Sequence, residues 1–161
     1  MTIDLHNLNN RLFKTDKKFD VIYADFIYED LDFTWVYHFW NMLKDGGVMI
    51  QQTDYHSVAE IKIFTQRMRD ANFLNWLTWK NEFGNFRKDR FRQCHDDILI
   101  YSKGKNWVWH PEKIQVPKAT MTKGLNPSGR ETKQATGWID DCTLTTTAIE
   151  RVRKDDGHLI R

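Results

Sequence analysis

The chain has 161 residues, 40% of them hydrophobic and 14% aromatic, which is enough for one domain with a real core. Its formal net charge of +2 excludes a polycation that would bind nucleic acid through its overall field. Cys94 and Cys142 show no CxxC spacing, which argues against a disulfide framework or a structural zinc site, and no apolar run suits a signal peptide or membrane span. We therefore expect a cytoplasmic protein with reduced thiols.

The first predicted elements form a strand–helix–strand unit. Residues 21–24 are a short apolar run that enters Asp25, which is typical of a buried parallel strand. Residues 33–43 place apolar side chains at helical spacing, and Asp45-Gly46-Gly47 interrupts that pattern. Residues 48–52 are then predicted to form the next strand.

An amphipathic helix over residues 56–72 and strands over 73–79 and 97–102 continue the series. This order predicts an α/β fold with a mostly parallel sheet flanked by helices. The polar segment 81–96, and not a helix, joins the last two strands. We therefore expect those strands to form an antiparallel pair at the sheet edge.

The composition changes after residue 104, which predicts a division into residues 1–104 and 105–161. Residues 105–117 are aromatic and basic, whereas residues 118–133 are rich in Thr, Lys, Gly and Ser, as in a mobile loop or linker. Residues 140–153 have the pattern of a short helix.

Asp25 and Tyr28 are the candidate site residues at the end of the first strand. Open α/β sheets bind ligands at the carboxyl ends of their parallel strands, where this acid and this aromatic residue are expected to lie. The alternative for Asp25 is an ordinary strand-end acid or helix N-cap, and for Tyr28 a half-buried core residue.

Three segments resemble the amino-group DNA methyltransferases, which modify adenine N6 or cytosine N4. FDVIYADFIY at residues 19–28 resembles the strand and the Asp-Pro-Pro-Tyr tetrapeptide of that family. LKDGGVMI at residues 43–50 resembles its next helix end and strand. WLTWKNEFGNFRKDRFRQCHDDILIYSKG at residues 76–104 resembles its last two strands. The motifs occur in the family's order and spacing, which makes the resemblance specific over residues 19–104.

The resemblance implies the catalytic half of a Rossmann-like methyltransferase sheet and transfer of a methyl group from S-adenosylmethionine to a base flipped out of DNA, as in restriction-modification. Asp25 would accept a hydrogen bond from the exocyclic amine and border the cofactor, and Tyr28 would stack on the base. Phe26 and Ile27 stand where the family carries prolines, so this catalytic loop must reach its shape by packing. Adenine is the preferred target, from its frequency in the family.

A basic and aromatic run in the same region is the candidate DNA-binding segment. Its residues are Phe86, Arg87, Lys88, Arg90 and Arg92, with Phe91 between the last two. The alternative is a solvated loop with a few salt bridges. Cys94, His95 and Asp96 lack a further cluster that would complete a metal site, so we expect His95 to hydrogen-bond locally and orient the last strand.

Residues 105–161 correspond by resemblance to the family's target-recognition or linker segment, with Trp107, Trp109 and Lys113 as its candidate contacts. The alternative is a flexible tail that is ordered only by contact with another part of the protein.

The sequence has no glycine-rich Phe-Gly turn after a strand, which is the family's main S-adenosylmethionine site. The resemblance places that site near the carboxyl end in members whose catalytic motif comes first. We therefore expect a carboxyl-terminally truncated chain that binds the cofactor weakly or not at all, and whose strand at residues 21–24 is an unpaired edge open to self-association.

Two other functions remain open from the sequence. A non-catalytic nucleic-acid-binding module derived from this fold would retain the basic and aromatic run without methyl transfer. A metal-dependent nuclease would instead use Asp25, Glu29, Asp30 and Asp54.

Overall fold

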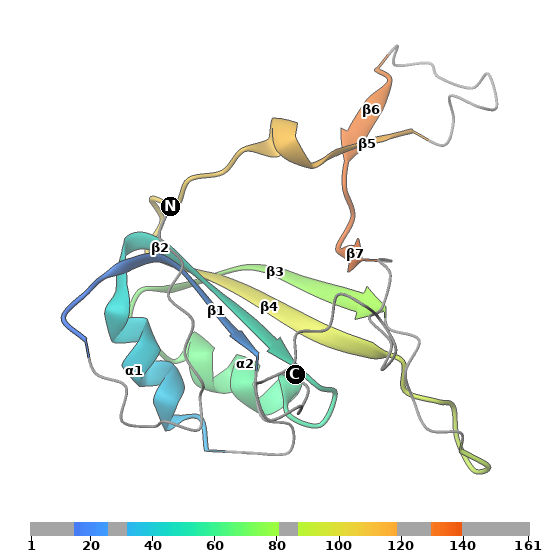
Figure 1. The fold of residues 1–161 in the computed structure, drawn as a ribbon, viewed down its shortest axis with the longest axis horizontal. Coiled ribbons are helices and arrows are strands. Elements are labelled where there is room, and N and C mark those ends of the chain that lie inside the picture. The colour runs from blue at the N-terminus through green and yellow to red at the C-terminus, as the bar shows by residue number, and fades with distance from the viewer. Residues whose placement is uncertain (1–14, 26–31, 81–86, 119–129, 140–161) are drawn as a thin grey trace, which may run out of the picture.

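The computed structural model describes residues 15–25, 32–80, 87–118 and 130–139. Within them, a five-stranded sheet has the strand order β1-β2-β4-β3-β7, and two α-helices accompany it (Figure 1). The elements of this unit are β1 (Phe19–Asp25), α1 (Thr34–Met42), β2 (Leu43–Thr53), α2 (Val58–Gln66), β3 (Ala71–Lys80), β4 (His95–Lys103) and β7 (Trp138–Ile139). Neither helix has the length and apolar content needed to cross a membrane.

The strand directions confirm the predicted α/β class. β1 is parallel to β2, β4 is antiparallel to both β2 and β3, and β7 is parallel to β3. All strands of this sheet therefore run the same way except β4, which agrees with the predicted mostly parallel sheet and antiparallel last pair. That pair is not at the edge as predicted, because β4 is inserted between β2 and β3 and β7 lies outside β3.

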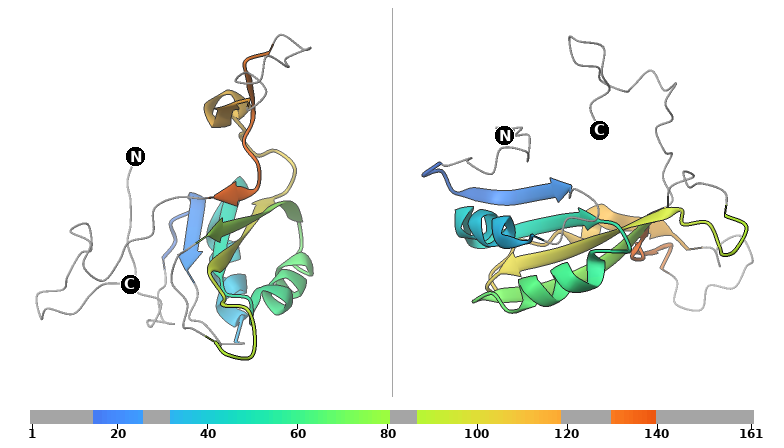
Figure 2. Two further views of the ribbon diagram at one scale, coloured as in Figure 1. Left: turned by 90° about the vertical axis from the view of Figure 1, so that its right-hand side faces the viewer. Right: turned by 90° about the horizontal axis from the view of Figure 1, so that it is seen from below.

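Both helices cover one face of the sheet (Figures 1 and 2), and the core lies between them and that face. Period-two alternation places Met49 of β2 with Leu99 and Tyr101 of β4 on this face, all fully buried. Val36 and Trp40 of α1 and Ile61 of α2 pack against them. Burial of these aliphatic and aromatic side chains is the main stabilising contribution to the unit.

The opposite face of the sheet carries no α-helix in the described part of the chain. Val21 and Tyr23 of β1 point to this open face and are 56% and 55% exposed, whereas Ala24 points to the helices and is 3% exposed. Asp25 shares the face of Val21 and Tyr23, because side chains two residues apart lie on the same side of a strand. The side chain of the candidate site residue Asp25 therefore lies on the open face of the sheet.

Two predicted boundaries were wrong, each because of a backbone turn. The predicted helix over residues 56–72 ends at Gln66, since Asp70 takes a left-handed conformation (φ 63°) and turns the chain into β3. Asp45-Gly46-Gly47 lies inside β2 rather than before it. Gly46 has φ 76°, and a Cβ there would stand 2.4 Å from the Asn106 carbonyl oxygen, so the close approach of that segment requires glycine.

The described part of the carboxyl-terminal segment contains ordered elements. A 3-10 turn, η1 (Pro111–Ile114), comes first. β5 (Gln115–Pro117) and β6 (Thr132–Gln134) then form an antiparallel pair that projects from the main sheet (Figure 1). The chain then returns to the sheet, where the Thr78 N–H donates to the Gly137 carbonyl over 2.8 Å just before β7. The short helix predicted at residues 140–153 lies outside the described residues.

Candidate functional site

Three adjacent strands, β1, β2 and β4, bring polar side chains from distant parts of the sequence to one edge of the sheet. Asp25, the last residue of β1, is paired with Gln52 of β2. Gln52 is paired with Ile98 of β4, and Asp96 lies two residues earlier on the same face of that strand. The edge predicted to bind a ligand therefore contains a carboxylate from each of two strands, with the Gln52 amide between their strands.

A hydrogen-bond chain runs across this open face. The Tyr23 hydroxyl donates to Gln52 Oε1, and Gln52 Nε2 donates to Asp96 Oδ2 over 3.1 Å. Gln52 is only 5% exposed, so both ends of its amide are satisfied within the protein rather than by bulk water. These two bonds fix the orientation of the amide, and with it the position of the Asp96 carboxylate.

The electrostatics of this edge raise the pKa values of Asp25 and Tyr23. Partial loss of hydration, followed by the negative charge of Asp96, raises the pKa of Asp25 above its ordinary value. Burial of the phenol, then Asp25 and Asp96, raises the pKa of Tyr23 to about 12. The Tyr23 hydroxyl is therefore a neutral donor at physiological pH, and Asp25 is a more basic acceptor than a fully hydrated aspartate.

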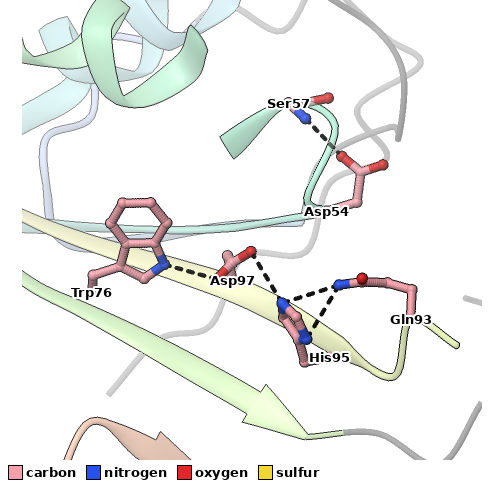
Figure 3. Close-up of polar contacts among 6 residues, drawn as sticks. All are labelled: Asp54, Ser57, Trp76, Gln93, His95 and Asp97. Carbon is pink, nitrogen blue, oxygen red and sulfur yellow. Dashed lines mark hydrogen bonds and ion pairs between the residues drawn. The ribbon is translucent and has the colours of Figure 1, made fainter. Parts of the chain in front are cut away.

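A second polar cluster lies on the helix-covered side, at the beginning of β4 (Figure 3). Asp97 is buried and accepts a 2.7 Å hydrogen bond from Trp76 Nε1. His95 Nε2 lies 3.8 Å from Asp97 Oδ2, and Gln93 Nε2 lies 3.0 Å from the same ring nitrogen. The prediction that His95 bonds locally where the last strand begins is confirmed by these contacts.

Asp54, a candidate ligand in the nuclease hypothesis, is engaged elsewhere. Its carboxylate accepts the Ser57 backbone N–H over 3.1 Å in the turn that leads into α2 (Figure 3). Glu29 and Asp30 lie outside the described residues. Among the residues that are described, no three His, Cys, Asp or Glu side chains come together as metal ligands, so the geometry gives the nuclease hypothesis no support.

The described part of the loop between β3 and β4 is basic and exposed. Its exposed basic side chains are Arg87, Lys88, Arg90 and Arg92. Phe91 beside them is 100% exposed. Arg90 is paired with Asp89 through a 2.5 Å contact, so its charge is partly compensated, and the loop joins β4 at the edge that carries Asp25.

Several predicted site residues lie outside the described residues, namely Phe26, Ile27, Tyr28 and Phe86. Their predicted roles in the catalytic loop and in DNA contact stay predictions, as do those of Asp25 and the basic side chains.

The sequence reasoning missed Tyr23 and Gln52, and it considered Asp96 only as a metal ligand. Strand alternation in VIYAD was the available signal for Tyr23, because it places Tyr23 on the face of Asp25, whereas the position of Gln52 depends on the pairing of β1 with β2. Asp96 had no such signal, since its position depends on the pairing of β4 with β2.

A family model described as DNA methylase matches residues 13–158. Among 60 matching solved chains, one is described as "crystal structure of M1.HpyAVI-SAM complex" and has 18% sequence identity and a TM-score of 0.49, with 58% of this chain and 48% of that chain covered. Another, "crystal structure of M1.HpyAVI", has 18% identity and a TM-score of 0.46, with 55% and 45% covered.

The chain thus spans about half the length of these two structures. No curated protein matches it. The family-model match extends over most of the chain and includes β1, the sheet edge and the basic loop. The chain belongs to the N6/N4 DNA methylase family.

Proposed function

We propose that this chain is the catalytic part of a DNA methyltransferase that acts on the exocyclic amine of a flipped-out base, adenine in preference to cytosine. The observation that carries the proposal is Asp25, which ends an edge strand on the open face of the sheet and has a raised pKa. Membership of the DNA methylase family supplies the reaction class.

The proposed role of Asp25 follows from the chemistry of the amine. The nitrogen lone pair of adenine N6 or cytosine N4 is delocalised into the ring, which makes it a poor nucleophile. A carboxylate that accepts one N–H hydrogen bond favours the tetrahedral nitrogen needed for attack and stabilises the positive charge that develops there. The raised pKa of Asp25 makes it a stronger acceptor for this purpose.

S-adenosylmethionine, when bound, would supply an activated methyl group on a sulfonium. Of the described residues, Asp25 is the one proposed to border it, at the end of β1. The described glycines do not form the expected cofactor turn: Gly46 and Gly47 precede the central part of β2, Gly104 follows β4 at the opposite end of the sheet, and Gly137 precedes β7. We therefore propose that the described residues provide one side of a cofactor pocket, at Asp25.

We further propose that residues 1–104 act as the catalytic half and that residues 105–161 contribute to target recognition. β1 pairs only with β2 among the described strands, so its other edge is available to a segment that completes the cofactor pocket. Isothermal titration calorimetry of this chain with S-adenosylmethionine should give no tight, stoichiometric binding. A tight one-to-one isotherm would contradict the half-pocket proposal.

Transfer of a labelled methyl group to unmethylated DNA tests the catalytic proposal, with Asp25→Asn as the matched variant. The amide keeps the size of the carboxylate but removes its charge, so any transfer that the wild type gives at a high S-adenosylmethionine concentration should be lost in the variant. Equal transfer by both proteins would contradict the role of Asp25. DNA that lacks adenine but retains cytosine tests the proposed base.

A second candidate function, a non-catalytic DNA-binding module, is favoured by the exposed loop between β3 and β4. Arg87, Lys88 and Arg92 are exposed, and the fully exposed Phe91 offers a face for stacking on a base. This module would bind DNA without methyl transfer, and Asp25→Ala would leave binding intact. Fluorescence anisotropy with duplex DNA over a series of salt concentrations measures this property.

The matched control for that measurement is Arg90, whose charge is partly compensated by Asp89. Replacing Arg87, Lys88 and Arg92 together by glutamine should reduce both the affinity and its salt dependence, by about 0.9 in log–log slope for each DNA phosphate that is no longer neutralised. Arg90→Gln should have a smaller effect. An unchanged salt slope in the triple variant would exclude this loop as the DNA-binding surface.

A further inference from the structure

Asp96 is a second carboxylate on the open face near Asp25. It lies on β4, which is separated from β1 by β2, so the two acids come together only through the order of the sheet. Strand alternation places Asp96 on the face of Gln52 and Asp25, whereas its neighbours His95 and Asp97 face the helix-covered side. The negative charge of Asp96 reaches both Asp25 and the Tyr23 hydroxyl.

Gln52 holds Asp96 in place, and Tyr23 holds Gln52. A glutamine amide can be turned either way, but here its Oε1 accepts from the Tyr23 hydroxyl and its Nε2 donates to Asp96 Oδ2 over 3.1 Å. The reversed amide would aim its NH₂ group at a hydroxyl and its oxygen at a carboxylate, which is unfavourable for Asp96. The chain of bonds therefore fixes a buried amide beside two acids.

We propose that Asp96 is a positioning residue of the amine site, held by Gln52 and Tyr23, whose fixed negative charge makes Asp25 a stronger hydrogen-bond acceptor for the target amine. The inference rests on the proposed function, because it assigns Asp96 a task in that same reaction. A like charge nearby disfavours the ionised form of Asp25, and so increases its affinity for an N–H donor. The same pair of carboxylates would stabilise a nitrogen that becomes positive as it is methylated.

Loss of hydration is the first cause of the raised pKa of Asp25, and in the described part of the chain Asp96 is the charged group that adds to it. From β1, the facing titratable group is Tyr23, which is neutral at physiological pH. From β2, the facing group is the uncharged Gln52, and Asp54 beyond it is buried against the Ser57 N–H. Lys80 at the end of β3 lies opposite His95 in the strand register, and His95 is on the other face from Asp96.

Carbon-13 NMR of the side-chain carboxyl groups tests the inference directly on the full chain, without cofactor or DNA. The titration of Asp25 is followed in the wild type, in Asp96→Asn and in Asp96→Glu, with the Asp25 signal assigned from Asp25→Asn. Asparagine keeps an oxygen to accept from Gln52 but has no charge, whereas glutamate keeps the charge. We expect the pKa of Asp25 to fall toward its ordinary value in Asp96→Asn and to stay raised in Asp96→Glu.

An Asp25 midpoint that is unchanged in Asp96→Asn would overturn the inference. Equal falls in both variants would also overturn it, because they would reflect disturbed packing rather than the removal of charge. Amide spectra of each variant verify that the sheet is intact. Methyl transfer is measured separately: transfer that survives Asp25→Asn would count against the proposed function, whereas the dependence of the Asp25 midpoint on Asp96 tests the carboxylate pair alone.

Discussion

At the scale of single residues, the site combines groups that are individually ordinary. Asp25 ends a strand, as many acids do, and its pKa is raised by partial dehydration and then by the charge of Asp96. Gln52 is a buried polar side chain whose cost is offset by two hydrogen bonds. A glutamine in this position would usually be interpreted as core packing, and only its two partners reveal a link to the acids.

Because the pKa of Asp25 is raised in the folded state, we expect this residue to make the stability of the fold depend on pH. The folded state binds the Asp25 proton more tightly than the unfolded state, so the group destabilises the fold where it must ionise, above its raised pKa. That cost disappears as the pH falls below the ordinary value of 3.8, where both states are protonated. Asp25→Asn should therefore raise the melting temperature at pH 7.

Thermal unfolding of the two proteins over a series of pH values measures this effect. The difference between Asp25→Asn and the wild type should shrink as the pH is lowered toward 3.8. Asp20→Asn on the same strand is a matched control, since Asp20 is exposed and paired with Lys44 at 2.9 Å. A wild type more stable than Asp25→Asn at pH 7 would contradict the expected destabilisation of the fold by the ionised Asp25 carboxylate.

At the scale of the elements, the sequence predicted the positions of β1, α1, β2, β3 and β4 because apolar spacing distinguishes strands from helices. It also predicted the antiparallel relation of β3 and β4, from the polar connection between them. It did not predict that β4 lies between β2 and β3, because strand order depends on pairings between residues far apart in the sequence. The hydrogen bond between Gln52 and Asp96 was missed for the same reason.

Two glycines with left-handed backbones allow a matched test of how the segment after β4 returns toward β2. Gly46 has φ 76° and would place a Cβ 2.4 Å from the Asn106 oxygen, whereas Gly104 has φ 79° with nothing within 4 Å. Gly104→Ala should cost about 1–2 kcal/mol from backbone strain alone. Gly46→Ala should cost more, because the Asn106 backbone must also move.

Urea denaturation of the two alanine variants provides the comparison, with the free energy of unfolding as the readout. Equal destabilisation of the two variants would mean that the backbone around Asn106 moves to admit the Gly46→Ala methyl group without a measurable cost in the free energy of unfolding. In that case the close approach at Gly46 would not help to hold the projecting part of the chain against the sheet.

At the scale of the whole molecule, the described part has one sheet face covered by helices and a seven-residue edge strand, β1, that pairs with β2 alone among the described strands. Antiparallel or parallel addition of another strand to such an edge needs only backbone groups, so it is weakly selective. We predict that the chain self-associates in a concentration-dependent way through β1, and that Val21→Lys reduces this association by placing a charge on the edge strand.

Sedimentation velocity over a hundredfold range of concentration measures the association. The control is Val108→Lys, because Val108 is 76% exposed and lies after β4, in none of the strands. An equal reduction by both substitutions would indicate a general effect of charge. No concentration dependence in the wild type would show that the β1 edge is protected in solution.

The two consecutive acids of β4 point to opposite faces, Asp96 to the open face and Asp97 to the buried cluster with Trp76. A slip of β4 by one residue would exchange them, because it turns every side chain of the strand to the other side. The slipped strand would lose the Trp76 bond to Asp97 and would turn Leu99 and Tyr101 out of the core. Packing of the hydrophobic core therefore also fixes the geometry of the site. Only the register of β4 that buries Leu99 and Tyr101 places a carboxylate beside Gln52.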